Sequence, residues 1–326
     1  MPELTYREAI SQGLREALQD RNVFIMGEDI GYYGGAYAVT KGFVQEFGEE
    51  RIKDTPISES AIVGAGIGAA LAGLRPIVEI MTINFSLMAM DQIVNHAAKL
   101  RYMSGGQLSV PLIVRTVTGG GAQLAATHSQ SFEGWYAHVP GLKVLAPSTP
   151  NDALGLFRSA LQEEDPVIFV EHILLYGSKG EVPEHNYTIP IGKADIKRLG
   201  NDLTLVASSR MVQVALQAAH ALEARGISAE VVDLRSLRPL DVDTVIQSVE
   251  KTHRALVIDE GWLTGGFAAE VGSRIQEEAF DMLDAPVTRV GGVEVPMPYA
   301  ANLEREVIPN PERVVHKALG LLGKLS

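Results

Sequence analysis

Glu59 is the residue of this sequence whose surroundings best suit proton transfer. It lies in the segment Thr55–Ser60, immediately before a stretch with helical spacing. Pro56 favours an extended approach, and Ser58 or Ser60 is a suitable N-cap, so Glu59 is expected at a helix N-terminus. Its apolar neighbours predict partial burial, which favours the protonated carboxyl and suits proton exchange with a ligand nitrogen. A solvated first-turn carboxylate, stabilised by the helix dipole, is the structural alternative.

His128 is a second candidate because it lies in a polar, glycine-rich loop. Three consecutive glycines open the segment Gly119–Ser131, and Thr127 and Ser129 flank the histidine. The segment follows a predicted strand, and loops at the carboxyl ends of strands carry binding and catalytic residues in α/β proteins. Imidazole is the side chain best suited to exchange protons under physiological conditions, so a histidine in such a loop is a candidate proton donor or acceptor. A surface histidine without a function is the alternative.

Met81–Asp91 also follows a predicted strand. Within it, Met81, Phe85 and Met88 are spaced so that soft sulfur atoms and an aromatic ring can line a pocket for a flat heterocycle. Methionine and aromatic residues at helical spacing more often belong to a hydrophobic core. The residues alone therefore favour a core position.

The segment Ala160–Pro166 ends a predicted helix with several acidic side chains. The last carbonyl oxygens of a helix have no partner within it, and with acidic side chains nearby they can bind a hard cation. An ordinary charged helix terminus explains the same pattern, and the sequence alone favours it.

Glycines at positions 64, 66, 68 and 73 do not form a dinucleotide-binding motif. In that motif a Gly-x-Gly pair after a strand is followed by a third glycine three residues later, where a helix begins. No pair here has its third glycine at that distance. We interpret the stretch as a small-residue helix that permits close packing, and a nucleotide-binding dehydrogenase is the disfavoured alternative.

Apolar runs of strand length alternate with segments of helical spacing, which predicts two α/β domains. The first part has predicted strands at Val23–Gly27, Pro76–Ile80, Val110–Arg115, Leu142–Ala146 and Val167–Glu171, and predicted helices at Thr5–Gln19, Ala61–Gly73, Phe85–Lys99 and Asn151–Glu163. The second part has predicted strands at Leu203–Ala207, Ala229–Asp233 and Ala255–Asp259, and predicted helices at Met211–Arg225, Asp241–Glu250 and Phe267–Phe280. Turn-forming residues near 177–192 indicate a linker between them.

The composition is that of an acidic globular protein. Of 326 residues, 46% are hydrophobic, and 28 basic against 40 acidic residues give a net charge of −12. A basic cluster for nucleic acid, an apolar run long enough for a membrane helix, and cysteine for disulfide or thiolate chemistry are all absent from the sequence. The first residues lack a signal or transit pattern. We therefore expect the bacterial cytoplasm, or a plastid if a targeting segment has been removed.

Taken in order, several segments resemble the beta subunit of the thiamine-diphosphate-dependent decarboxylase component of 2-oxo acid dehydrogenase complexes. The likeness is greatest to the pyruvate dehydrogenase family and extends over nearly the whole chain. It rests on Met26–Asp29, Gly35–Tyr37, Arg51–Glu59, Ala72–Pro76, Met81–Ser86, Tyr102–Gly106, His128–Gln130, Pro140–Val144, Leu237–Asp241 and Val295–Tyr299. The resemblance implies a transketolase-like pyrimidine-binding domain over residues 1–180, a linker over 181–200 and a transketolase C-terminal domain over 201–326.

The resemblance also implies roles for individual residues. Glu59 matches the glutamate that bonds N1′ of the cofactor's aminopyrimidine ring, which lets the imino tautomer remove the thiazolium C2 proton and form the reactive ylide. Ile57, Met81 and Phe85 fall where the family packs that ring. His128 falls at the family's active-site histidine, which is implied to assist decarboxylation or acyl transfer.

Two metal ions are implied as well. A structural potassium ion is expected on backbone oxygens of Leu112, Ala160 and Leu161, with help near Glu163 and Asp165. The last two differ from the aspartate and asparagine expected in some relatives, so their side-chain roles do not carry over directly. The Gly-Asp-Gly motif that holds magnesium and diphosphate in thiamine-diphosphate enzymes is absent from the sequence. An alpha subunit is therefore expected to supply magnesium and the diphosphate half of the site.

The implied assembly has two alpha and two beta chains and docks on the dihydrolipoyl acyltransferase core. Its implied reaction is oxidative decarboxylation of pyruvate and transfer of the acetyl group to lipoyl domains. A branched-chain 2-oxo acid such as 2-oxoisovalerate, or acetoin, is the alternative substrate, because the alpha subunit forms part of the pocket wall. A non-catalytic assembly subunit is a further alternative, and it predicts that Glu59 and His128 are exposed and replaceable.

Overall fold

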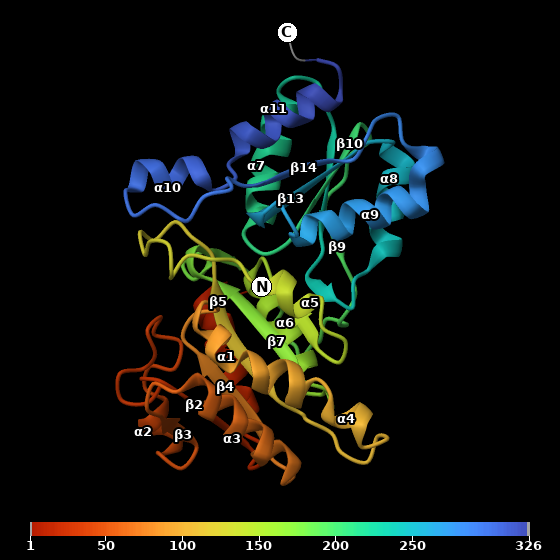
Figure 1. Cartoon of the computed structure of the whole chain (residues 1–326). Helices are drawn as coiled ribbons and strands as arrows, with labels where there is room; N and C mark the ends of the chain where they lie inside the picture. The colour runs from red at the N-terminus through yellow and green to blue at the C-terminus, as the bar shows by residue number, and fades with distance from the viewer. Residues whose placement is uncertain (1, 325–326) are drawn as a thin grey trace. The chain divides into compact units, whose positions relative to one another are not determined.

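The computed structural model describes residues 2–324 and divides them into two units (Figure 1). Unit 1 contains residues up to 118, residues 135–191 and residues 237–239, and unit 2 contains residues 119–134, residues 192–236 and the chain from residue 240 onward. Each unit has its own sheet with flanking helices, so the predicted class of two α/β domains is confirmed. The boundaries 1–180, 181–200 and 201–326 stay a prediction.

Unit 1 is built on a seven-stranded sheet. Its strand order is β12–β6–β7–β5–β4–β2–β3, and the pairs from β6 to β3 are all parallel. Every residue of the central strands β5 and β7 is buried, as expected when helices cover both faces of a parallel sheet. The strands are β2 (Val23–Gly27), β3 (Ile52–Asp54), β4 (Arg75–Ile80), β5 (Ile113–Thr118), β6 (Lys143–Leu145), β7 (Val167–His172) and β12 (Ser236–Arg238).

α1 (Tyr6–Ala17) and α6 (Pro150–Ala160) pack together over one face of this sheet. α1 begins with a capping box, in which Thr5 Oγ1 accepts from the Glu8 N–H at 3.2 Å and the Glu8 carboxylate accepts from the Thr5 N–H at 2.8 Å. The apolar side of the helix then joins the sheet in one core, whose largest members include Tyr6, Ile10, Leu14, Ile25, Phe157 and Phe169.

α3 (Glu59–Leu71) covers the opposite face. A Cβ atom on Gly66 would lie 2.7 Å from Val78 Cγ1 of β4, so the helix approaches the sheet closely at this point. Ile77, next to Val78, belongs to the core under α1, and successive strand residues point to opposite faces. The glycines at 64, 66 and 68 thus lie inside a helix, whereas a phosphate-binding loop would precede it. The predicted close packing is observed at Gly66, while a Cβ atom on Gly68 would meet nothing within 4 Å.

The segment after β4 is where the structure departs most from the predicted helices. One helix was expected over Phe85–Lys99, but the chain forms a 3-10 helix, η1 (Phe85–Ala89), then a π-helix, η2 (Gln92–Ala97), and the short α4 (Leu100–Met103). Ala89, Ile93 and Ala97 are nonetheless all buried. Apolar spacing specified the buried face, but it does not distinguish a helix of uniform pitch from a tight turn followed by a wide one.

The remaining elements of unit 1 are short. β1 (Glu3–Thr5) pairs antiparallel with β8 (Lys179–Glu181), and the others are α2 (Phe43–Phe47) and η3 (Ile173–Leu175). α5 (Glu133–Ala137) follows the loop that begins at Gly119. The predicted strand Val110–Arg115 is observed later, as β5, because Pro111 has no N–H to donate to a neighbouring strand.

Unit 2 contains a five-stranded sheet of order β14–β13–β10–β11–β9, in which only β9 is antiparallel. Its strands are β9 (Asp195–Arg198), β10 (Leu203–Ala207), β11 (Ala229–Asp233), β13 (Ala255–Trp262) and β14 (Thr288–Gly292). Its helices are α7 (Met211–Glu223), α8 (Val242–Thr252), α9 (Phe267–Ala279), η4 (Phe280–Met282), α10 (Ala301–Val307) and α11 (Pro311–Leu321). Within residues 2–324, none of the helices combines the length and the apolar character that crossing a lipid bilayer requires.

β9 lies within the segment 181–200 that was predicted as a linker. It is an edge strand, and all four of its residues are half-buried. Charged residues are typical of edge strands, because they discourage pairing with other chains. The same charges removed the apolar pattern by which a strand is recognised in a sequence.

A buried ion cluster lies on the α1 side of the unit 1 sheet. The guanidinium of Arg115 (β5) donates to Glu171 (β7) at 2.6 and 2.9 Å and to Glu79 (β4) at 2.5 Å. Tyr176 donates its hydroxyl to Glu171 at 2.7 Å. One guanidinium thus faces two carboxylates, and burial, followed by the charge of Glu171, raises the pKa of Glu79 even though Arg115 lowers it.

We expect the free energy of unfolding of Glu79→Gln to increase, relative to that of the unsubstituted protein, as pH rises. The folded-state pKa of Glu79 lies above its usual 4.5, so the stability gained from its proton is complete below about pH 4.5 and lost as pH rises through the folded pKa. Glutamine keeps the neutral form at every pH. Urea unfolding between pH 5 and pH 8 measures the difference, and a difference independent of pH would contradict the assignment.

Arg115→Met provides the contrasting variant. It leaves two buried carboxylates without their cation and should lower the free energy of unfolding by about 3–5 kcal/mol across this pH range. Arg101→Met is the matched control, because its ion pair with Asp165 is exposed and contributes about 0–1 kcal/mol.

Candidate functional site

The order of the unit 1 strands gathers three chain segments at one edge of the sheet. β4, β2 and β3 are adjacent and parallel, so their carboxyl ends share that edge. Met81 follows β4, Glu28 follows β2, and residues 55–58 lead from β3 to Glu59. In open α/β sheets, ligands bind outside the carboxyl ends of the strands.

Glu59 is the first residue of α3 and is half-buried. The backbone of Ser58 occupies the N-cap position, and its carbonyl accepts from the Ile62 N–H at 2.9 Å. The predicted side-chain cap was wrong: Ser58 has φ −159° and ψ 78° and makes no capping hydrogen bond. The amide groups of the first turn are therefore not satisfied by a serine hydroxyl, and their positive dipole end lies at Glu59.

Glu28 is a site residue that the sequence interpretation missed. It follows the last residue of β2, and its pKa is raised by partial burial and by the negative charges of Asp29 and Glu59. A carboxyl whose pKa is raised by a neighbouring carboxylate accepts a proton more readily than an isolated one. A carboxylate directly after a buried strand was the available signal, but its proximity to Glu59 depends on the pairing of β2 with β3.

The turn after β4 is held firmly by hydrogen bonds. The Ile83 N–H donates to the Val117 carbonyl at 2.8 Å, and Ser86 Oγ donates to the Ile83 carbonyl at 2.5 Å. The Tyr136 hydroxyl in turn donates to Ser86 Oγ at 2.5 Å. This turn begins η1, which packs against α3. Phe85 is thereby held close to the helix that Glu59 begins.

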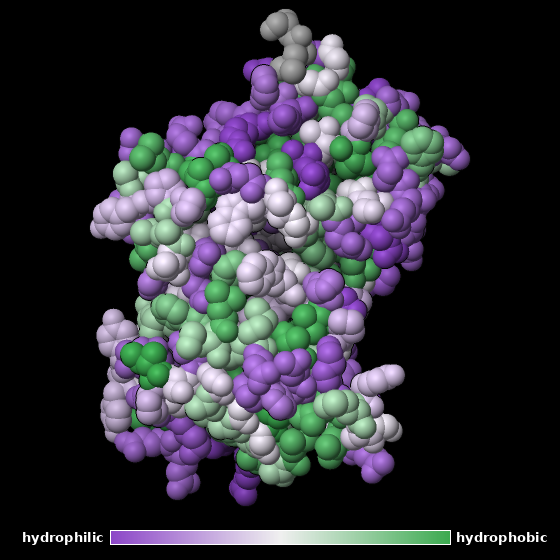
Figure 2. All heavy atoms as spheres, in the orientation of Figure 1, coloured by the Kyte–Doolittle hydropathy of each residue, from purple (hydrophilic) through white to green (hydrophobic). Residues whose placement is uncertain are grey.

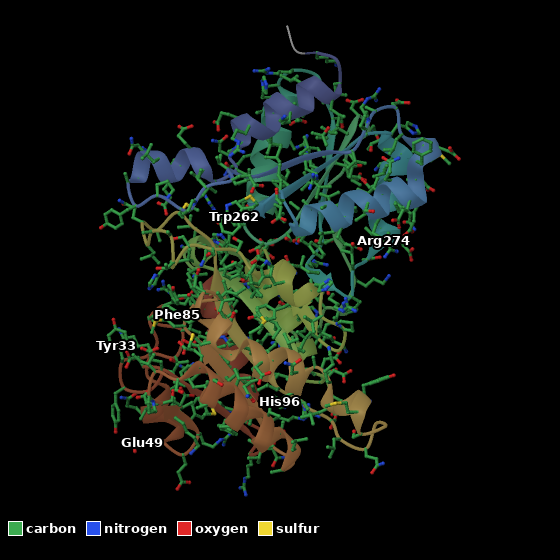
Figure 3. All side chains as sticks on the ribbon, in the orientation of Figure 1. Tyr33, Glu49, Phe85, His96, Trp262 and Arg274 are labelled. Carbon is green, nitrogen blue, oxygen red and sulfur yellow. The ribbon has the colours of Figure 1, made fainter. Side chains whose placement is uncertain are left out.

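The predicted ring-packing residues differ in exposure. Met81 and Phe85 are half-buried, whereas Ile57 is 74% exposed and Met88 is 70% exposed. Figure 3 shows Phe85 on the same side of the view as Tyr33, an aromatic residue that is 72% exposed. Figure 2 shows apolar side chains reaching the surface among polar ones. Exposed apolar residues beside a candidate site are typical of a surface that a ligand or another chain covers.

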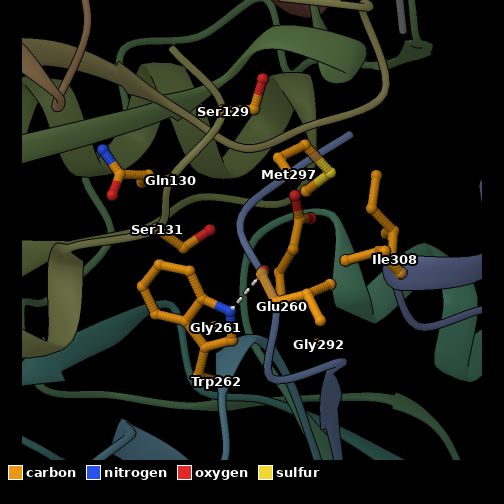
Figure 4. A pocket seen from close by; sticks show the side chains of 11 residues that line it. Ser129, Gln130, Ser131, Glu260, Gly261, Trp262, Gly292, Met297 and Ile308 are labelled. Carbon is orange, nitrogen blue, oxygen red and sulfur yellow. Dashed lines mark hydrogen bonds between the residues drawn. The ribbon is translucent and has the colours of Figure 1, made fainter. Parts of the chain in front are cut away.

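His128 belongs to unit 2 and Glu59 to unit 1. The imidazole is exposed, and its Nδ1 lies 2.9 Å from Thr127 Oγ1. Ser129, the next residue, is buried. Ser129, Gln130 and Ser131 line a small pocket of unit 2 together with Trp262 and others, and Trp262 Nε1 donates to the Val295 carbonyl at 3.2 Å (Figure 4).

The groups predicted to bind potassium lie near the end of α6. The carbonyl oxygens of Leu161 and Glu163 converge on one nitrogen, Arg75 Nη1, at 3.0 Å each. The carbonyl groups of Ala160 and Leu112 each accept one backbone N–H. Each carbonyl oxygen has a second lone pair, and neutral oxygens of this kind are ligands that a hard cation accepts.

The acidic side chains of the same segment already have cationic partners. The carboxylate of Glu163 pairs with Lys143, and that of Asp165 pairs with Arg101 at 3.1 Å. Across the part of the chain that the structure describes, no cluster of three or more histidine or acidic residues is arranged to hold a metal ion. Any cation at this position would therefore depend on the carbonyl oxygens.

Comparison with known proteins agrees with this geometry. The family model "Transketolase, pyrimidine binding domain" matches residues 2–179, and "Transketolase, C-terminal domain" matches residues 192–314. The chain is 50% identical over 321 residues to pyruvate dehydrogenase E1 component subunit beta-2, mitochondrial, of Oryza sativa subsp. japonica, covering 97% of this chain and 85% of that protein. The chain belongs to the family of pyruvate dehydrogenase E1 beta subunits.

Bacterial members of the family are similarly close. The subunit beta of Rhizobium meliloti is 49% identical over 317 residues, covering 97% of this chain and 69% of that protein. That of Rickettsia felis is 47% identical over 314 residues, covering 96% of each. Among solved structures, a split-gene transketolase described as an inactive beta4 tetramer has a TM-score of 0.80 at 24% identity, covering 98% of this chain and 99% of that one, and shows the shared fold.

Proposed function

We propose that this chain is the beta-subunit half of a thiamine-diphosphate-dependent decarboxylase that acts on pyruvate and passes the acetyl group to lipoyl domains. The observation that carries the proposal is the position of Glu59, at the start of α3 on the shared carboxyl edge of β4, β2 and β3, in a chain that belongs to the pyruvate dehydrogenase E1 beta family. The names of the relatives in that family support pyruvate, rather than 2-oxoisovalerate or acetoin, as the proposed substrate of this chain.

An alpha subunit would complete the site. The exposed Ile57 needs a covering group, and the sequence has no Gly-Asp-Gly motif for magnesium and diphosphate. We propose that the alpha subunit covers Ile57 and supplies the groups that bind magnesium and diphosphate. The proposed assembly has two alpha and two beta chains and docks on the acyltransferase core. The bacterial cytoplasm is the compartment that we propose for it.

The residues of this chain would bind and orient the cofactor and move protons. Bound thiamine diphosphate supplies a nucleophilic carbon that attacks the carbonyl of a 2-oxo acid. Glu59 would hold a proton against N1′ of the aminopyrimidine, while Met81, Phe85 and Ile57 would fix the plane of that ring. Glu28, whose pKa is raised in part by the charge of Glu59, would be the second carboxyl at this edge of the sheet. His128 would hold or donate a proton during decarboxylation or acyl transfer.

Glu59→Gln tests the first role. With the alpha subunit, magnesium and thiamine diphosphate present, we expect carbon dioxide release from pyruvate, with ferricyanide as electron acceptor, to fall by about 10²–10⁴-fold, the usual contribution of a positioned proton donor. Glu50→Gln, which alters an exposed carboxylate of the same unit, should be unaffected. An unchanged rate in Glu59→Gln would sink the assignment. The same assay with 2-oxoisovalerate decides the substrate.

His128→Gln tests the second role. We expect at least one of two rates, decarboxylation or acetyl transfer to an isolated lipoyl domain, to fall by about 10²-fold or more, because glutamine cannot carry the proton. His220→Gln is the control, since this exposed histidine lies on α7. If both half-reactions keep their rates, His128 is not catalytic and the assembly-subunit alternative gains support.

We also propose that potassium binds to the carbonyl oxygens of Leu112, Ala160 and Leu161, beside Arg75. The support is the convergence of the Leu161 and Glu163 carbonyl oxygens on one positively charged nitrogen. A bound potassium ion would supply a second positive charge at the carboxyl end of α6, where the helix dipole is negative. The carboxylates of Glu163 and Asp165 would not bind the potassium ion. They would contribute only by holding the cationic side chains of Lys143 and Arg101 away from it.

Replacing potassium chloride by choline chloride at equal ionic strength tests this site. Because an ion that binds only the folded state stabilises it, we expect the Tm to fall by about 2–4 °C on removal of potassium. Equal Tm values in the two salts would contradict potassium binding. The Arg75 guanidinium would then be the cation that the carbonyl oxygens at the end of α6 bind.

A further inference from the structure

The loop that carries His128 has an unusual backbone path. Gly119, Gly121, Gln123 and Ala125 have φ angles of 95°, 97°, 58° and 63°. Alternation of left-handed residues with ordinary ones turns successive amide N–H groups toward one side of the chain, which forms a concave nest for an anion. Two of these residues are not glycines, so the conformation is strained and needs external support.

Two carboxylates of unit 2 provide that support. The Gly121 N–H donates to Glu304 Oε1 at 2.9 Å, and the Gln123 N–H is shared between Glu304 Oε1 and Oε2 at 3.1 and 3.2 Å. The Gly120 N–H donates to Glu260 Oε1 at 2.8 Å. Consecutive amide groups of the loop are therefore held by side chains that lie more than 130 residues further along the chain.

Glu304 is only 2% exposed and lies in the first turn of α10. A carboxylate removed from water is costly unless hydrogen bonds replace its hydration, and amide donors to a charged oxygen are among the stronger hydrogen bonds in proteins. The bonds therefore act in both directions: the loop satisfies the buried charge, and the charge holds the loop in its strained path.

Packing leaves the loop little freedom at the same point. A Cβ atom on Gly120 would lie 2.8 Å from Met297 Cε and 3.0 Å from Ile308 Cδ1. Figure 4 shows Glu260, Met297 and Ile308 around the pocket that Ser129 also lines. The base of the loop is thus anchored by charge and by contact, whereas the imidazole of His128 is exposed.

We propose that Glu304, assisted by Glu260, is a positioning residue that holds the Gly119–Ser131 loop and thereby places His128 for the reaction. The inference rests on the proposed function only for the role of His128. The clamp itself is a property of unit 2 and can be measured without turnover.

The test is made in the assembled alpha–beta protein with Glu304→Ala and the more conservative Glu304→Gln. Hydrogen–deuterium exchange of peptides covering residues 119–131 should become at least tenfold faster in Glu304→Ala, because the loop amides lose their acceptor. Glu304→Gln, which keeps one acceptor oxygen, should lie between Glu304→Ala and the unsubstituted protein. Glu306→Ala, an exposed carboxylate on the same helix, should leave the exchange unchanged.

Kinetics separate positioning from general stability. We expect kcat in the half-reaction that depends on His128 to fall at least tenfold in Glu304→Ala, with KM for pyruvate unchanged and partial recovery in Glu304→Gln. If Glu304→Ala does not fold, the Glu304→Gln comparison decides. Unchanged exchange of residues 119–131 would overturn the clamp. Faster exchange without loss of kcat would overturn the positioning role, and the rate of His128→Gln then shows whether the proposed function fails as well.

Discussion

The parallel pairing of β4, β2 and β3 is the constraint on which the candidate site depends. Parallel strands all end at one edge, and these three are adjacent, so segments that begin at residues 28, 55 and 81 meet there. Burial of the strands by α1 on one face and α3 on the other keeps that edge free for loops. Glu59 then stands at the start of α3, and its charge contributes to the raised pKa of the nearby Glu28 carboxyl. A different strand order would leave the same residues unable to act together.

Carboxylates that accept from backbone amides are used in both units to fix loops. In unit 1, Asp54 at the end of β3 accepts from the Gly31 N–H at 2.6 Å and so ties down the segment that follows β2 and Glu28. In unit 2, Glu304 performs the same task for the loop of His128. An amide has a fixed position relative to its backbone, so each such bond specifies the path of the loop as well as stabilising it.

Two apolar side chains near Glu59 reach the surface of unit 1. Ile57 is 74% exposed and Met88 is 70% exposed. By contrast, the Arg115 cluster is buried, and this chain supplies all of its charged partners. The relatives at about 50% identity are named beta subunits, which implies an alpha subunit as the partner of this chain. Covering of the surface near Glu59 by that subunit is part of the function proposed above.

Local patterns in the sequence determined the elements and the chemistry of the principal residues. Apolar runs located Val23–Gly27, Leu203–Ala207 and Ala229–Asp233 as strands at their observed bounds, because strands of a sheet covered by helices are mostly apolar. Turn and helix-start signals are local, so the place of Glu59 at a helix N-terminus and the loop of His128 could also be predicted, although the helix was expected from Ala61 and the predicted serine side-chain cap is not formed. Only the tertiary structure decided that Glu28 lies near Glu59, that charged β9 is a strand, and that Glu304 holds an amide 183 residues away. These features depend on which distant segments pair and which charges are buried together, and neither is encoded in the spacing of neighbouring residues.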